Sequence, residues 1–340
     1  MAWDKPMPRN PVVAVAGATG AVGREMLLTL HQRAFPASRV IALASERSAG
    51  KQVAFGTGEL AVEEMTPESF QGVDIALFSA GASISKEMRQ AVVASGCVMI
   101  DNSSAFRMDA DVPLVVPEVN PEDVAWHSGV IANPNCSTIQ MVVALAPLDR
   151  LARIKRVVVA TYQAASGAGA AAMEELYAQS RDFLMGQELH VENFAHRIAF
   201  NCIPHIDVFL DDGSTKEEWK MVAETKKIMH REDIQVAVTC VRVPVLRCHS
   251  EAVNVEFDAP VDLSEIVEAL EGGAGITMLD DPETKAYPMP ALLEGTDDVY
   301  VGRVRWDPSV RYGMQMWVVA DQLRKGAALN AVQIAEVLLG

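Results

Sequence analysis

The residues that decide the fold are Val12-Val13-Ala14-Val15-Ala16 and the stretch that follows them, Gly17-Ala18-Thr19-Gly20-Ala21-Val22-Gly23. The apolar run is typical of a buried strand, and residues 24–32 are expected to form a helix. Glycines between a strand and a helix let the backbone approach a pyrophosphate, and the helix N-terminus supplies N–H donors and a positive dipole end. The pattern indicates a dinucleotide site. A tight turn in some other α/β protein is the alternative.

The first third of the chain continues this alternation of strands and helices. Further apolar runs at residues 40–44, 73–79 and 98–101 are expected to be strands, and residues 84–95 have helical character. Strands that alternate with helices predict βαβ units, a parallel sheet and right-handed crossovers.

The character of the sequence changes near residue 135. Helices are expected over residues 137–150, 168–185, 214–230 and 322–339, and strands over 156–164, 234–245, 252–258, 299–305 and 314–320. Long strands with few helices between them favour a mixed or antiparallel sheet, with one face left for helices or a partner subunit. We therefore expect a Rossmann-like α/β domain over residues 1–135 plus 321–340, and an α+β domain over residues 136–320.

Composition narrows the range of functions. The chain has 340 residues, with 29 basic and 45 acidic side chains, so its formal net charge is −16. Half of the residues are hydrophobic, which is typical of a globular protein. The negative charge argues against a nucleic-acid binder and against binding to an anionic membrane, because both need clustered Lys and Arg. An anionic small molecule, which needs only a few local cations, is not excluded.

The cysteines and the apolar segments bear on the compartment. The five cysteines show no zinc-finger spacing, so we expect neither a bound metal nor a disulfide scaffold, and a cytoplasmic location is favoured. The N-terminal MAWDKPMPRN lacks the apolar stretch of a secretory signal. The longest uncharged run, residues 157–173, contains Gln163, Ser166 and glycines, so it predicts no membrane span.

The end of the second predicted strand bears on the choice of cofactor. An acidic residue at this point binds a ribose 2′-hydroxyl, whereas an arginine accommodates a 2′-phosphate. Glu46 favours a ribose 2′-hydroxyl and Arg47 favours a 2′-phosphate, but Arg47 and Ser48 together offer a cation and a hydroxyl for a phosphate. This favours NADP. A solvated loop charge is the alternative for Arg47.

Cys136 is a candidate nucleophile. It lies in Asn133-Pro134-Asn135-Cys136-Ser137-Thr138, directly before an apolar helix. A helix N-terminus favours the thiolate form of a cysteine, and a thiolate is a competent nucleophile. We interpret Cys97, Cys202 and Cys240 instead as small hydrophobic residues.

A thiolate beside a nicotinamide suggests oxidation of an aldehyde through a thioester. Such a cycle needs an acid/base group, oxyanion donors and cations for anionic substrates. Arg242 and His249, in the stretch RVPVLRCHSE, are candidates for these roles. A purely structural histidine is the alternative for His249.

The motifs GATGAVG, SSAFR, NPNCST, YQAASGAG, EEWKMVAETKKI and RVPVLRCHSEAV, in this order, resemble those of aspartate-β-semialdehyde dehydrogenases. The resemblance runs from Pro11 to about Glu336. It implies a cytoplasmic homodimer that interconverts L-aspartate-4-semialdehyde, phosphate and NADP with L-4-aspartyl phosphate and NADPH. This reaction serves the synthesis of lysine, methionine, threonine and diaminopimelate.

The resemblance also implies roles for individual residues. Cys136 is similar to the nucleophile, His249 to the acid/base group and Gln163 to the residue that orients the intermediate. Arg242 resembles the arginine that binds the substrate carboxylate, and Glu217 resembles the partner of its amino group. Arg107 and Lys220 resemble the phosphate-binding pair. The residues that resemble the NADP contacts are Thr19, Gly20, Ala21, Val22, Arg47, Ser48, Ser166, Gly167 and Gln322.

Two other functions fit part of the pattern. An N-acetyl-γ-glutamyl-phosphate reductase would share the fold, the cysteine and the histidine, but its acylated substrate needs no acid in the place of Glu217. A protein that only senses NADP would need neither Cys136 nor His249.

Overall fold

The chain folds into two compact units. The computed structural model describes residue 3 and residues 5–340. The first unit comprises the described residues up to Asn135 together with Ala327–Gly340, and the second comprises Cys136–Gly326.

The first unit is built on a largely parallel sheet. In the described part of the chain this sheet has seven strands in the order β3-β4-β2-β1-β5-β6-β7. Only β3 runs antiparallel to its neighbour, β4. The strands are β1 (Val12–Ala16), β2 (Arg39–Ala44), β3 (Gln52–Phe55), β4 (Gly58–Glu64), β5 (Ile75–Phe78), β6 (Val98–Asp101) and β7 (Val130–Ala132).

Helices cover both faces of this sheet. One face buries Val13, Val15 and Leu77 against α1 (Ala21–Gln32) and α8 (Leu329–Leu339), which contact each other. The alternate residues of the strands point to the other face, where Phe78 stacks on Phe70 and α2 (Ala82–Ala94) packs beside β6. This doubly covered parallel sheet is the Rossmann-like fold that the sequence predicts.

The glycine-rich turn lies where the strand order reverses, because β1 pairs with β2 on one side and β5 on the other. Gly17 has a φ of +89° and its N–H donates to Leu43 O at 2.8 Å. A Cβ on Gly17 would lie 2.3 Å from Ser79 O, and one on Gly23 would lie 2.1 Å from Gly17 O. Glycine is therefore required at both positions.

The second unit contains a mixed sheet. In the described residues it has six strands in the order β11-β12-β13-β10-β8-β9, of which β8/β9 and β11/β12 are parallel pairs. The strands are β8 (Ile154–Gln163), β9 (Gln235–Arg242), β10 (His249–Phe257), β11 (Ile276–Met278), β12 (Val299–Asp307) and β13 (Gly313–Ala320).

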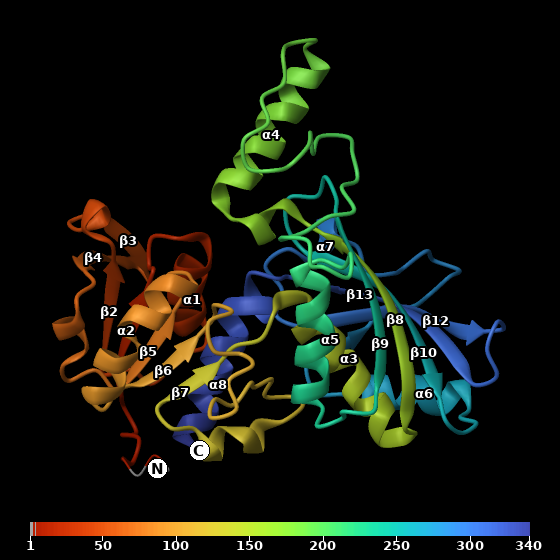
Figure 1. Cartoon of the computed structure of the whole chain (residues 1–340), viewed down its shortest axis with the longest axis horizontal. Helices are drawn as coiled ribbons and strands as arrows, with labels where there is room; N and C mark the ends of the chain where they lie inside the picture. The colour runs from red at the N-terminus through yellow and green to blue at the C-terminus, as the bar shows by residue number, and fades with distance from the viewer. Residues whose placement is uncertain (1–2, 4) are drawn as a thin grey trace. The chain divides into compact units, whose positions relative to one another are not determined.

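One face of this sheet is covered by α3 (Cys136–Leu151), α5 (Lys216–Ile228) and α6 (Leu263–Glu271). The helix α4 (Ala170–Leu184) extends away from the sheet, and the short α7 (Pro290–Leu293) lies near β13 (Figure 1). We call the other face, which includes Val158, Tyr162 and Asn254, the open face.

Several element boundaries differ from the predicted ones. The tail begins with a π-helical turn, Arg324–Ala328, before α8 starts. Residues 321–326 belong to the second unit, whereas we expected them in the first. Asp321 accepts the N–H of Gly295 and Gln322 accepts that of Cys248, and both partners lie in the second unit. The strands β3, β4, β7 and β11 and the helix α6 were not expected, since their sequences are short or only partly apolar.

Among the described residues, no helix combines the length and apolarity that crossing a bilayer requires. Across the same residues, no group of His, Cys, Asp and Glu side chains is arranged to hold a metal ion.

We expect Gly17→Ala to lower the free energy of unfolding by more than about 2 kcal/mol, because it combines backbone strain with a clash at Ser79 O. Gly50→Ala is the matched control, since Gly50 has a φ of +81° but no atom within 4 Å of its Cβ position. It should cost only the strain, about 1–2 kcal/mol. Equal losses in chemical denaturation would show that the close approach at Ser79 is unimportant.

Candidate active site

Three of the predicted site residues stand side by side across the second sheet. Gln163, the last residue of β8, pairs with Arg242, the last residue of β9. The antiparallel register that pairs Tyr162 with Ser250 brings Gln163 opposite His249, the first residue of β10. All three side chains are buried on the helix-covered face. We call Arg242, Gln163 and His249 the site row.

His249 is fixed in one tautomer by the backbone. Its Nδ1 accepts the N–H of Ala164 at 3.1 Å, so the neutral ring carries its proton on Nε2. Burial, and then the charge of Arg242, holds the pKa of His249 well below its ordinary value. At neutral pH the ring is therefore an uncharged donor at Nε2.

Gln163 is oriented by partners at both ends of its amide. Its Oε1 accepts from Thr161 Oγ1 at 3.0 Å, and its Nε2 donates to Glu217 Oε1 at 3.2 Å. Gln163 Nε2 lies 3.5 Å from His249 Nε2. Because both nitrogens carry hydrogen, they are two donors that face a common space.

Glu217 and Lys220 are neighbours on α5, as their spacing predicts. Lys220 Nζ lies 3.2 Å from Glu217 Oε2 and 2.6 Å from Asp207 Oδ2. Burial alone would lower the pKa of Lys220, but the two carboxylates outweigh it and raise that pKa. Asp207 was not identified from the sequence, because it lies in a loop with no motif around it. Its φ is +68°.

Arg242 borders the same space as His249. Its Nη1 donates to Ala164 O at 2.6 Å. A Cβ on Gly167 would lie 2.9 Å from Arg242 Nη1 and 3.0 Å from His249 Nε2, so the missing side chain of Gly167 keeps this space open. Burial lowers the pKa of Arg242, an effect that Glu217 and Cys136 oppose.

Cys136 is the first residue of α3, as predicted, and it is partly exposed. The chain passes closely beside it at Gly326, in the π-helical turn, where a Cβ would lie 2.9 Å from Cys136 Cβ. Glycine is thus needed at residue 326 for the backbone to pass the thiol. No sequence motif pointed to Gly326.

Gln322 and Ser166, both predicted cofactor contacts, bind each other. Gln322 Nε2 donates to Ser166 Oγ, and Gln322 Oε1 accepts the N–H of Cys248 at 2.8 Å. Cys248 has a φ of +71°, which is rare for a residue with a side chain. The amide of Gln322 therefore holds the strained residue that precedes His249.

The predicted pyrophosphate site in the first unit has a suitable backbone. Gly20, the N-cap of α1, is exposed, and no described side chain caps this helix. The N–H groups of Ala21 and Val22 belong to the first helical turn, which has no acceptors within the helix. Thr19 is partly exposed, like Ala21 and Val22. The turn fits a pyrophosphate.

The predicted 2′-phosphate site contains one cation that we did not predict. Arg47 is exposed in the short helical turn after β2, and Ser48 is buried. Lys51 Nζ lies 3.4 Å from Ser48 Oγ. In the sequence, the position of Lys51 four residues after Arg47 could have indicated a second cation at this site.

Arg107 lies in the first unit, whereas the site row lies in the second. Its Nε donates to Asn133 O and its Nη2 to Asn102 O, both at 2.9 Å. The side chain is buried. These bonds fix the guanidinium beside the segment that leads to Cys136.

Comparison with known proteins agrees with this arrangement. Residues 12–127 match the family model "Semialdehyde dehydrogenase, NAD binding domain", and residues 145–325 match "Semialdehyde dehydrogenase, dimerisation domain". The aspartate-semialdehyde dehydrogenase of Aquifex aeolicus is 55% identical over 331 residues, which cover 96% of this chain and 97% of that protein. The chain belongs to the aspartate-semialdehyde dehydrogenase family. It is an oxidoreductase acting on an aldehyde group, and the predicted family is confirmed.

Further members of the family support this. The aspartate-semialdehyde dehydrogenase of Bacillus subtilis is 52% identical, and the match covers 98% of each chain. The Vibrio cholerae aspartate semialdehyde dehydrogenase II complexed with ASA has a TM-score of 0.94 at 48% identity, covering 97% of this chain and 98% of that one. The enzyme from Candida albicans, solved with NADP, has a TM-score of 0.74 at 25% identity, covering 97% and 98%. The match of residues 12–127 to the NAD binding domain model agrees with the predicted dinucleotide cofactor, and the Candida albicans relative was solved with NADP.

We expect Arg47→Ala to weaken the binding of NADP more than that of NAD, because only NADP carries the 2′-phosphate. A charge-assisted hydrogen bond contributes about 1.5–3 kcal/mol, so the preference for NADP should fall about tenfold or more. Titration with both cofactors measures it. Arg39→Ala, at the opposite end of β2, is the control. Equal losses for the two cofactors would exclude a 2′-phosphate contact.

Proposed function

We propose that this chain catalyses the reversible, NADP-dependent conversion of L-aspartate-4-semialdehyde and phosphate into L-4-aspartyl phosphate, with Cys136 as the nucleophile. The observation that carries the proposal is the site row, in which a buried arginine and two N–H donors converge in the unit that begins with Cys136. The product would supply the synthesis of lysine, methionine and threonine. We place this reaction in the cytoplasm.

The cofactor would be held by the glycine-rich turn and by the end of β2. The backbone from Thr19 to Val22 would bind the pyrophosphate, and Arg47, with Ser48, the 2′-phosphate. NADP, when bound, accepts the hydride whose loss turns the adduct on Cys136 into a thioester. We also propose that Ser166, Gly167 and Gln322 border the nicotinamide, with Gln322 acting mainly through its bonds to Ser166 and Cys248.

Cys136 would add to the aldehyde carbon and form a thiohemiacetal. The oxygen of this adduct becomes negative, and a negative oxygen is stabilised by converging donors. Gln163 Nε2 and His249 Nε2 are such donors. Because His249 is neutral and protonated on Nε2, its acid/base role takes the form of a hydrogen bond to this oxygen.

The substrate's amino and carboxylate groups need partners of opposite charge. Arg242 presents a planar guanidinium, which suits a carboxylate better than a lysine would. Glu217 is a buried carboxylate beside Gln163, and it would bind the substrate ammonium. An N-acylated substrate would leave Glu217 without this role, which favours aspartate semialdehyde over the alternative.

Phosphate would attack the thioester and release Cys136. We assign Arg107 and Lys220 to its binding. Lys220 engages two carboxylates, so a third N–H of its ammonium is left for a ligand. The support for Arg107 is its place in the SSAFR motif.

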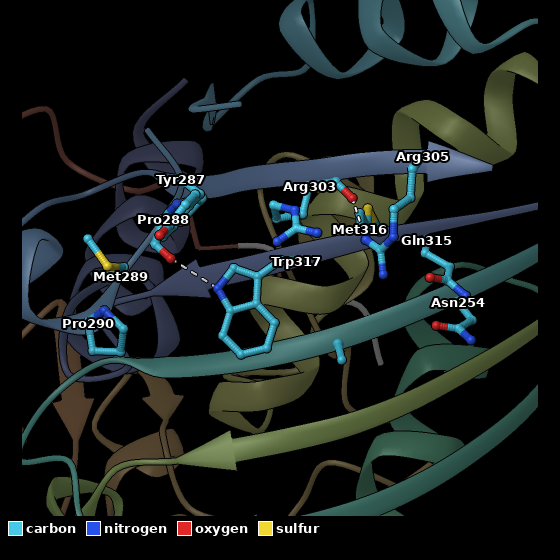
Figure 2. A pocket seen from close by; sticks show the side chains of 11 residues that line it. Asn254, Tyr287, Pro288, Met289, Pro290, Arg303, Arg305, Gln315, Met316 and Trp317 are labelled. Carbon is cyan, nitrogen blue, oxygen red and sulfur yellow. Dashed lines mark hydrogen bonds between the residues drawn. The ribbon is translucent and has the colours of Figure 1, made fainter. Parts of the chain in front are cut away.

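We further propose that the enzyme is a homodimer formed through the open face. Tyr162 is 39% exposed there and its ring lies 5.2 Å from that of Trp317. A hollow of about 410 Å³ lies beside Trp317, between this face and the segment 287–290. Figure 2 shows the side chains that line it. Its lining includes Asn254, Gln315 and Arg305. A half-apolar sheet face of this kind is typical of a subunit contact.

The direct test is the reduction of NADP by aspartate semialdehyde, with and without phosphate. We expect turnover only with phosphate, and a loss of several orders of magnitude in Cys136→Ser, because a hydroxyl is a poor nucleophile at neutral pH. NADP should still bind to this variant. Cys202→Ser, on an exposed cysteine, is the control. More than a tenth of the wild-type turnover in Cys136→Ser would rule out Cys136.

The two anion sites should separate in steady-state kinetics. Lys220→Ala should raise the Michaelis constant for phosphate much more than that for the semialdehyde. Arg242→Lys keeps the charge but loses the planar guanidinium that can bind a carboxylate through two N–H groups, so it should chiefly impair use of the semialdehyde. Lys226→Ala, on the same helix as Lys220, is the control. The opposite pattern would mean that the two assignments must be exchanged.

Val158→Arg should convert the dimer into monomers, because it places a charge in the middle of the open face, four residues before Tyr162. Sedimentation velocity measures the change. Glu268→Arg introduces the same side chain on the exposed surface of α6, and it should leave the dimer intact. A dimeric Val158→Arg variant would place the interface elsewhere.

A further inference from the structure

Glu251 is a buried acid that the proposed mechanism does not use. It lies on β10, two residues after His249, so both side chains point to the helix-covered face. Its neighbours in the sheet are Thr161 on β8 and Val318 on β13. The side chain is fully buried, and neither carboxyl oxygen has a hydrogen-bond partner among the described residues.

Gln140 is the polar side chain that reaches Glu251 from the covering helix α3. Gln140 lies four residues after Cys136, so it shares a helix face with the nucleophile. Its Nε2 approaches His249 O at 3.5 Å, and its Oε1 has no partner in the described residues. Two unpartnered acceptors, on Glu251 and Gln140, therefore belong to neighbouring buried side chains.

The surroundings offer Glu251 no cation. The structure's ion pairs among described residues include Arg231 with Asp149 and Arg247 with Asp321, but none with Glu251. On the next strand but one, the thiol of Cys240 has a pKa that burial raises, so it is uncharged as well. His249, on the same strand, is neutral. An ionised Glu251 would be a buried, unpaired charge, which is far more costly than a neutral acid.

We propose that Glu251 is a neutral carboxylic acid in the native enzyme, donates its O–H to Gln140 Oε1, and thereby positions Cys136 and His249. A proton on the Glu251 carboxyl group makes it a donor to Gln140 Oε1, whereas without that proton both groups would be acceptors. Gln140 then connects Glu251 to the backbone of His249, and α3 is tied to β10 one helical turn after Cys136. Burial raises the pKa of Glu251 well above its ordinary value. A bond from the N–H of Gln140 would favour the carboxylate, whereas the proposed bond to Gln140 Oε1 favours the protonated acid.

Glu251 is a positioning residue and not a proton relay for His249. A relay would have to reach Nδ1 of the ring, because Nε2 faces Gln163. Nδ1 already accepts the N–H of Ala164. The proposal assumes the proposed roles of Cys136 and His249, but its first test below does not depend on them.

The first test uses Glu251→Gln, which keeps the shape and a hydrogen-bond donor but has no titratable proton. The unfolded wild type releases this proton above about pH 4.5, while the folded protein retains it, so wild-type stability falls as the pH rises from that value to the native pKa. The ratio of the two folding equilibrium constants, variant over wild type, should therefore rise by up to about tenfold per pH unit from about pH 5 until the native pKa of Glu251 is reached. Denaturation at one protein concentration measures it.

The matched control is Glu256→Gln, on the same strand, whose carboxylate pairs with Lys155 at the surface. Its stability relative to wild type should not increase with pH. The protonated acid should also give a carbonyl band in the infrared difference spectrum between wild type and Glu251→Gln. A pH-independent stability ratio, or the absence of this band, would overturn the proposal whatever the activity is.

The second test concerns positioning. Glu251→Leu leaves Gln140 Oε1 without a donor, so turnover and the alkylation rate of Cys136 should fall at least tenfold while NADP affinity is unchanged. Glu251→Gln should keep both within about threefold of wild type. Gln140→Leu combined with Glu251→Leu should lose little more than either single variant, because the two residues act as one unit. Additive losses, or a Gln variant as impaired as the Leu variant, would refute the pairing.

Discussion

The register between β8, β9 and β10 is the constraint on which the site depends. It brings the last residues of two parallel strands beside the first residue of an antiparallel one, and so collects Arg242, Gln163 and His249 in one row. A shift of one residue in β8 would turn Gln163 to the open face and Tyr162 into the row. The placement of these three residues is therefore set by backbone hydrogen bonds within the sheet.

The row also explains why the site needs so much buried polarity. Arg242 and His249 are both buried, and each is held by a backbone group of Ala164. The backbone at Ala164 thus orients a cation and a neutral ring at the same time, and the charge of Arg242 helps to keep the ring neutral. Such preorganisation costs folding energy, but it spares the enzyme the reorganisation of these groups during the reaction.

Local signals allowed much of the fold to be predicted from the sequence. The glycine-rich turn was predicted from its glycine spacing between an apolar run and a helix, and Cys136 from a polar segment before an apolar helix. The remaining features depend on residues far apart in the chain. Asp207 meets Lys220 only because a loop returns to α5, and Gly326 meets Cys136 only because the tail passes α3. Neither contact leaves a pattern in the sequence around it.

Tyr162 and Gln163 are consecutive residues with side chains on opposite faces of β8. A single peptide group therefore joins the residue whose aromatic ring lies on the open face to the residue whose amide lies in the site row. Selection for surface packing and selection for reactivity cannot act independently at this point of the strand. Anyone who redesigns that surface should spare Tyr162 and begin at Val158, more than a full pleat away.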